Sequence, residues 1–244
     1  MKEGSHMKTV QTGGIPYLDA LTGSPDWYWG MDHTGGDLYE AEELYTDGHR
    51  IDRTRLILVR RSDGAVFEPI PAEKGRYFGK PVFDDGRIAL LTADFPAGKL
   101  RLWTVDPDSM SVASLASVPR DSFEDCYNLM PSPSPLMLTR QTGEVFEILW
   151  PRRVTIPIHP HESFCFRDGD LLFFSRWYED PDYREETVTR SVKDGRIVSS
   201  DRASACLMPD GQKWVLKSGK EFAHVSDGEA GDDPDQRHAQ TAAI

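Results

Sequence analysis

Apolar residues in this chain fall in short runs separated by turn residues, a pattern typical of consecutive β-strands. Five of these runs follow related turns, three of which contain Asp-Gly. Asp-Gly supplies the positive φ angles that a tight hairpin needs, so each instance predicts two antiparallel strands. The strands expected after the five turns cover residues 38–45, 87–93, 136–140, 171–177 and 212–217.

The turns mark an internal repeat. They lie at residues 31–36, 83–86, 130–133, 166–169 and 208–211, at intervals of 36 to 52 residues. A second turn follows in four repeats, at 61–64, 106–109, 151–153 and 193–195, which gives four strands to a complete repeat. WD40 and kelch blades have a similar period and strand number. The chain therefore resembles a five-bladed β-propeller with four-stranded antiparallel blades, although it lacks the Trp-Asp and double-glycine signatures of those two families.

The two ends of the chain predict how such a ring would close. The last repeat lacks a fourth strand, whereas residues 8–16 precede the first repeat and end in Ile15-Pro16, as another expected strand ends in Ile70-Pro71. Propellers commonly complete the last blade with an N-terminal strand, so we expect Val10 to pair beside Phe222. Residues 8–226 then form one domain, between a vector remnant (1–7) and a disordered acidic tail (227–244). An irregular β-sandwich and two small β-domains are the alternatives.

Helical signals are weak. Residues 37–45 have the composition of two helical turns, but their place after the first repeat turn favours a strand. Three cysteines are too few to staple a domain of 244 residues. We expect Cys126, Cys165 and Cys206 to lie in strands as reduced, inert thiols.

The net charge of −12 repels phosphate backbones and anionic membrane surfaces. No apolar run approaches the roughly 20 residues that cross a bilayer. We therefore expect a soluble protein, cytoplasmic unless a signal peptide was removed, that binds no nucleic acid and no membrane. The sequence indicates no cofactor, and it leaves a small polar ligand, such as a carbohydrate, or a protein as the partner.

In a propeller, the loops between blades share one face with the mouth of the axial channel, where ligands usually bind. Here these loops combine aromatic rings with carboxylates, which suits sugars because rings stack on their faces and acids accept hydroxyl hydrogen bonds. Trp27, Tyr77 and Tyr127 enter three successive repeats at similar positions and are candidate ligand-binding residues. The alternative is that these rings pack between blades as core.

The carboxylates give a second, distant resemblance, to furanosidase-type glycoside hydrolases. That resemblance implies an acid, a base and a helper carboxylate facing the channel, and the matching candidates are Asp26, Glu124, Asp125 and Glu162. The second repeat, however, begins with Arg76-Tyr77 where that family has a carboxylate. A non-catalytic binding or interaction module is therefore the leading hypothesis, and a glycoside hydrolase is the alternative.

Two histidines complete the candidate site. His159 and His161 share one side of an extended segment because alternate strand residues point the same way. A metal needs further ligands that no spacing selects, so we predict no metal site. We interpret both histidines, with Trp177 at the start of a long aromatic and charged loop, as candidate ligand-binding residues; an ordinary solvated loop is the alternative.

Overall fold

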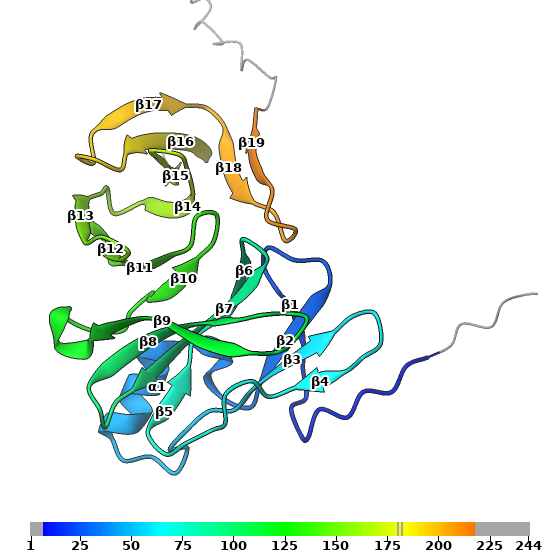
Figure 1. Ribbon diagram of the computed structural model, residues 1–244. Coiled ribbons are helices and arrows are strands. Elements are labelled where there is room, and N and C mark those ends of the chain that lie inside the picture. Colours follow the sequence, from blue (N-terminus) through cyan, green and yellow to red (C-terminus); the bar gives the residue numbers. More distant parts are fainter. Residues whose placement is uncertain (1–6, 180, 182, 218–244) are drawn as a thin grey trace, which may run out of the picture.

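The protein folds into five antiparallel sheets that follow one another along the chain (Figure 1). The computed structural model describes residues 7–179, 181 and 183–217. The predicted all-β class is confirmed. The first sheet comprises β1 (Asp19–Ala20), β2 (Trp27–Met31), β3 (Leu56–Arg60) and β4 (Val66–Phe67), and the second comprises β5 (Arg76–Phe78), β6 (Val82–Asp84), β7 (Arg87–Asp94), β8 (Lys99–Val105) and β9 (Val112–Pro119). The third sheet comprises β10 (Met130–Ser132), β11 (Met137–Gln141), β12 (Val145–Trp150) and β13 (Val154–Pro157), and the fourth comprises β14 (Glu162–Asp168), β15 (Leu171–Tyr178), β16 (Arg184–Ser191) and β17 (Ile197–Asp201). The fifth sheet is the hairpin of β18 (Ser204–Leu207) and β19 (Lys213–Leu216).

The core lies between successive sheets. On β7, Ile88 and Leu90 pack in a cluster with β3 of the first sheet, whereas Leu91 and Ala93 pack in a cluster that includes Leu138 of the third sheet. Alternate residues of a strand point to opposite faces, so β7 carries an unbroken apolar run at residues 88–91 because both of its faces are covered. A third cluster joins β11 and β12 to β15 and β16 in the same way.

The turns between β1 and β2, β6 and β7, β10 and β11, β14 and β15, and β18 and β19 lie at one end of the sheets, which we call the hairpin end. Here the sheets touch one another: Phe83 N–H donates to the Thr22 carbonyl at 2.8 Å. The Asp84 carboxylate then accepts backbone N–H groups from Ser134 and Leu136 of the third sheet. One half-buried acid thereby fixes the turn of the neighbouring sheet.

Three further contacts continue this series from the third sheet to the fifth and back to the first. They are Arg167 Nη1 to Met137 Sδ at 3.7 Å, Lys213 Nζ to Asp168 Oδ1 at 3.1 Å, and Gly23 N to the Pro209 carbonyl at 2.9 Å. The β18–β19 hairpin reaches toward β6 and the first sheet in Figure 1, in agreement with the last of these. Each of the five sheets therefore contacts the next, and the fifth contacts the first.

Several predicted turns are confirmed. Asp85 and Gly86, both with positive φ, connect β6 to β7, and all four predicted second turns join the last two strands of their sheets. Cys165 and Cys206 lie in strands as predicted, but Cys126 lies in the loop before β10. All three thiols are free, and burial raises the pKa of Cys126 to about 12.

The strand predicted at 38–45 is wrong, because these residues form helix α1 (Leu38–Thr46). The first sheet makes its first hairpin at residues 21–26, one turn earlier than predicted, so residues 32–55 connect its second and third strands. This connection also contains the short helix η1 (Thr34–Gly36). Asp37 caps α1 by accepting N–H groups of Tyr39 and Glu40. Leu38 and Ala41 on one face then pack into the core beside β7.

The predicted closing strand at 8–16 is not found in the last sheet. Among the described residues this segment pairs with no strand, and it lies against the first sheet instead. Ile15 is buried with Ile57 and Val59, and Arg55 donates to carbonyls of the segment. The apolar face of β3 would otherwise be exposed, which explains why the segment packs there. Phe222, most of the predicted vector remnant and the predicted acidic tail lie outside the described residues.

Within the described part of the chain, no helix is long and apolar enough to cross a membrane.

We expect Asp84→Ala to lower the free energy of unfolding by about 1–3 kcal/mol, because two backbone N–H groups of the third sheet lose their acceptor. Urea unfolding monitored by tryptophan fluorescence measures the change. Asp85→Asn, at the exposed neighbouring turn position, is the matched control and should leave stability nearly unaltered, since asparagine tolerates positive φ. Equal free energies of unfolding for Asp84→Ala and wild type would show that the Asp84 hydrogen bonds to the third sheet do not stabilise the fold.

Candidate functional site

The end of the sheets opposite the hairpins, which we call the loop end, holds most of the predicted site residues. The exceptions are clear. Asp26 lies at the hairpin end, where its carbonyl accepts the Arg61 N–H. Trp27 is buried against Phe67 of its own sheet. Tyr77 is fully buried, and its hydroxyl donates to the Ile51 carbonyl at 2.9 Å. The two predicted ligand-binding rings among these residues thus take the core positions of the alternative interpretation.

Glu162 begins β14, and two arginines enclose its carboxylate. Arg190 Nε lies 3.0 Å from Oε2 and Arg190 Nη2 lies 3.1 Å from Oε1, while Arg176 Nε donates to Oε1 at 3.1 Å. Burial tends to raise the pKa of Glu162, but hydrogen bonds and charge attraction from Arg190 and Arg176 outweigh it and hold the pKa below its ordinary value. An acid with a depressed pKa holds no proton to donate near neutral pH.

Asp125 is held in a similar way by Arg140, which is almost fully buried. Arg140 donates through Nη2 to Asp125 Oδ1 at 2.6 Å and through Nη1 to Glu147 of β12 at 3.0 Å. Burial tends to raise the pKa of Asp125, and the hydrogen bonds from Arg140 and the Tyr127 N–H lower it by more. Glu124 remains exposed, with 84% of its side chain accessible, at 3.8 Å from Arg140. These ion pairs anchor the loop that enters the third sheet.

The two histidines and Trp177 form a continuous aromatic group. His161 stacks on Trp177 with ring centroids 4.3 Å apart and planes 13° apart, and His159 meets His161 edge to face at 5.1 Å. The His159 Nδ1 accepts the His161 N–H at 3.2 Å, as expected for a tight turn. In the described residues, no three His, Cys, Asp or Glu side chains come together as a metal site.

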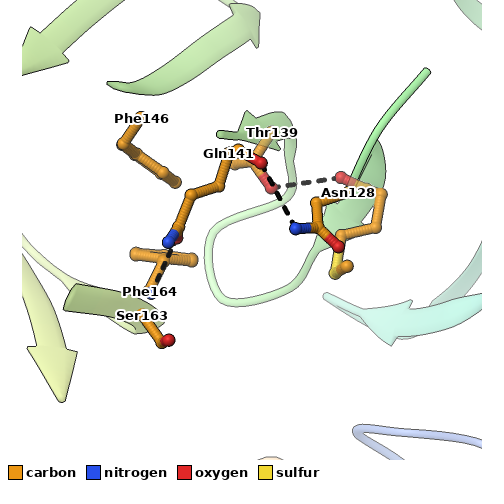
Figure 2. Close-up of a pocket in the computed structure, with 7 residues that line it drawn as sticks. Asn128, Thr139, Gln141, Phe146, Ser163 and Phe164 are labelled. Atoms are coloured by element: carbon orange, nitrogen blue, oxygen red, sulfur yellow. Dashed lines mark hydrogen bonds between the residues drawn. The ribbon is translucent and has the colours of Figure 1, made fainter. Parts of the chain in front are cut away.

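A cavity of about 230 Å³ opens between the third and fourth sheets at the loop end (Figure 2). Phe146 and Phe164 form its apolar part and stack at 4.6 Å. Met130 also lines the cavity. The remaining lining residues are polar but uncharged: Asn128, Thr139, Gln141 and Ser163. Because no charged side chain lines the cavity, it favours a neutral ligand with both apolar and hydrogen-bonding surface.

Gln141 holds the two walls of this cavity together. Its Nε2 donates to the Glu162 carbonyl at 2.7 Å, and its Oε1 accepts the Phe164 N–H at 2.9 Å. Asn128 in turn donates to the Gln141 carbonyl at 3.3 Å, as Figure 2 shows. The Gln141 amide thus satisfies two backbone groups of β14 from the neighbouring sheet.

Sequence reasoning missed these neutral residues. It selected Tyr127 and Glu162, which immediately precede Asn128 and Ser163, because aromatic and acidic residues carry a recognisable chemical signal. Asparagine, serine and glutamine in a loop or strand carry none. Only the pairing of β11 with β12 and the packing of β14 on that sheet bring the lining residues together.

Comparisons with known proteins assign no family: no protein-family model matches the chain, and no curated protein does. Among solved structures, the chain is similar to a prolyl endopeptidase (TM-score 0.46, 15% identity, 81% of this chain and 30% of that one). It is also similar to the acylaminoacyl peptidase of Pyrococcus horikoshii (0.42, 11%, 78% and 33%) and to a putative 6-phosphogluconolactonase of Bacteroides uniformis (0.40, 14%, 84% and 64%). The chain thus spans about a third of the length of the two peptidases. Similarity at this level assigns no activity.

We expect Glu162→Gln to lower the free energy of unfolding by about 3–5 kcal/mol at pH 7, because the buried Arg190 and the half-buried Arg176 lose their counter-ion. The folded-state pKa of Glu162 lies below its ordinary value of 4.5, so its contribution is present above that pH and is lost as the pH falls through the folded pKa. The difference between wild type and variant should therefore shrink as urea unfolding is repeated from pH 7 toward pH 3. Glu124→Gln, at the exposed carboxylate, should show neither effect. A stability difference between wild type and Glu162→Gln that stays the same from pH 7 to pH 3 would contradict the inference that the ionised Glu162 stabilises the fold.

Proposed function

We propose that this protein is a non-catalytic binding module with propeller-like architecture, whose loop end recognises a small, neutral, polar ligand, most simply a carbohydrate. The single observation that supports this proposal is the uncharged cavity between the third and fourth sheets, with its aromatic floor and amide and hydroxyl rim. Neutral sugars present the same combination of apolar ring faces and hydroxyl groups.

The ring architecture is supported by the contacts at the hairpin end. Each sheet contacts the next in sequence order, and the Gly23–Pro209 hydrogen bond joins the fifth to the first. A circular arrangement of sheets leaves their loop ends around a common mouth, which is where the cavity opens. The ring is closed in this proposal by hairpin contact, without an N-terminal strand in the last sheet.

A binding role is preferred to hydrolysis because of how the four candidate carboxylates are placed. Glycoside hydrolysis needs an acid and a second carboxylate on either side of the scissile bond. Glu162 and Asp125 are held in ion pairs with depressed pKa values, and Asp26 lies at the hairpin end. Of the four candidates, Glu124 alone offers a largely exposed carboxylate at the loop end.

The ligand proposal is tested by thermal unfolding with glucose, galactose, mannose, xylose and arabinose, followed by calorimetric titration of those that stabilise. A sugar at 100 times its dissociation constant should add about 2.7 kcal/mol to the stability. Ser163→Phe, which places a ring at the exposed wall of the cavity, should abolish the stabilisation. Ser199→Phe, on the exposed strand β17, is the matched control and should retain it. Binding that survives Ser163→Phe unchanged would place the ligand elsewhere.

The ring proposal is tested by Gly23→Ala. A Cβ at Gly23 would meet the Phe83 carbonyl oxygen at 2.3 Å, and φ of +96° strains any other residue. We expect faster hydrogen exchange in β18 and β19, because the hairpin contact that closes the ring is disturbed. Gly14→Ala, at φ of +95° with no atom within 4 Å of the new Cβ, controls for backbone strain alone. Equal exchange in the two variants would contradict closure through this contact.

A further inference from the structure

We infer that the ligand is an extended oligosaccharide, with one sugar unit in the cavity and neighbouring units on two aromatic platforms at its walls. This inference rests on the proposed function and names the form of the ligand. The first platform consists of Tyr39 and Tyr127, and the second of His161 and Trp177.

The first platform adjoins the third-sheet wall of the cavity. Tyr39 and Tyr127 meet edge to face at 5.6 Å and 90°, and they are 37% and 47% exposed. Tyr127 directly precedes Asn128, which lines the cavity. Two large rings that remain this exposed, one of them next in sequence to a cavity residue, offer apolar surface to a ligand.

The first platform is also rigid. Glu42 on α1 accepts hydrogen bonds from Arg120 and from the Cys126 N–H, which fixes the helix bearing Tyr39 to the loop bearing Tyr127. The Tyr127 N–H in turn donates to Asp125 at 3.0 Å. A preorganised platform loses little side-chain entropy when a ligand stacks on it, so more of the contact energy appears as affinity.

The second platform adjoins the fourth-sheet wall. His161 lies two residues before Ser163 of the cavity, about 7 Å along an extended chain, which is of the order of one sugar unit. Its ring stacks on the ring of Trp177, and the backbone N–H of Trp177 donates to the His161 carbonyl with an N···O distance of 3.4 Å. The stacked pair therefore continues the wall that Ser163 and Phe164 begin.

The positions of the two platforms select an extended ligand. One follows the wall made by the third sheet and the other the wall made by the fourth, so a chain that crosses the cavity contacts both. Glu124, three residues before Tyr127 and largely exposed, has carboxylate oxygens that can accept hydroxyl hydrogen bonds and that disfavour an anion. The ligand is therefore a neutral oligosaccharide rather than a uronate or a sugar phosphate.

The test is calorimetric titration with linear oligosaccharides of glucose, xylose, arabinose and mannose, from one to six units long. Affinity should rise with length until both platforms are occupied. Tyr127→Ala and Trp177→Ala should each weaken binding of the longer chains by roughly 2- to 12-fold, the range expected for one aromatic contact. Neither variant should alter binding of the monosaccharide.

Matched controls are Tyr17→Ala, in the segment before β1, and Trp214→Ala, on β19; both remove exposed rings far from the cavity in sequence. Circular dichroism and the melting temperature establish that each variant is folded. A monosaccharide that binds as tightly as every longer chain, or platform variants that weaken the monosaccharide equally, would overturn the extended-ligand inference and leave the binding module intact. Failure of every sugar of every length to bind would overturn the proposed function itself.

Discussion

The second and third sheets each bury both of their faces against neighbouring sheets, and this burial is the constraint on which the structure depends. A sheet covered on one face only would need alternating polar and apolar residues, whereas β7 is buried at six consecutive positions, 88–93, five of which are apolar. Such strands are stable only when a further sheet lies on each side. This requirement sets the succession of the sheets, and it places the third and fourth sheets close enough to share a cavity.

Local chemistry explains why part of this fold could be predicted. Asp85-Gly86 encodes its hairpin within two residues, and the turn forms as predicted because positive φ is required there. Helix α1 was missed because its identity depends on counting strands from the start of the chain. The hairpin at 21–26 has no Asp-Gly pair, so the count of strands begins one turn late and assigns the helical composition of residues 37–45 to a strand.

The candidate site was predictable only in its surroundings. Glu162 was selected as a reactive acid, but the arginines that neutralise it lie 14 and 28 residues further along the chain, on strands whose register no local pattern specifies. Similarly, the ion pair of Asp125 with Arg140 joins residues 15 positions apart, so the sequence does not reveal it. Ionisable residues identify the region of a site, whereas the sheet packing decides whether they are reactive or structural.

The neutral character of Gln141 has a consequence for the conditions under which the cavity keeps its shape. Both of its contacts to β14 are amide hydrogen bonds between uncharged groups. Dissolved salt screens the attraction between exposed ions but has little effect on such bonds. The spacing of the two cavity walls should therefore be the same at low and at high salt concentration, even though exposed charges on a chain of net charge −12 respond to ionic strength.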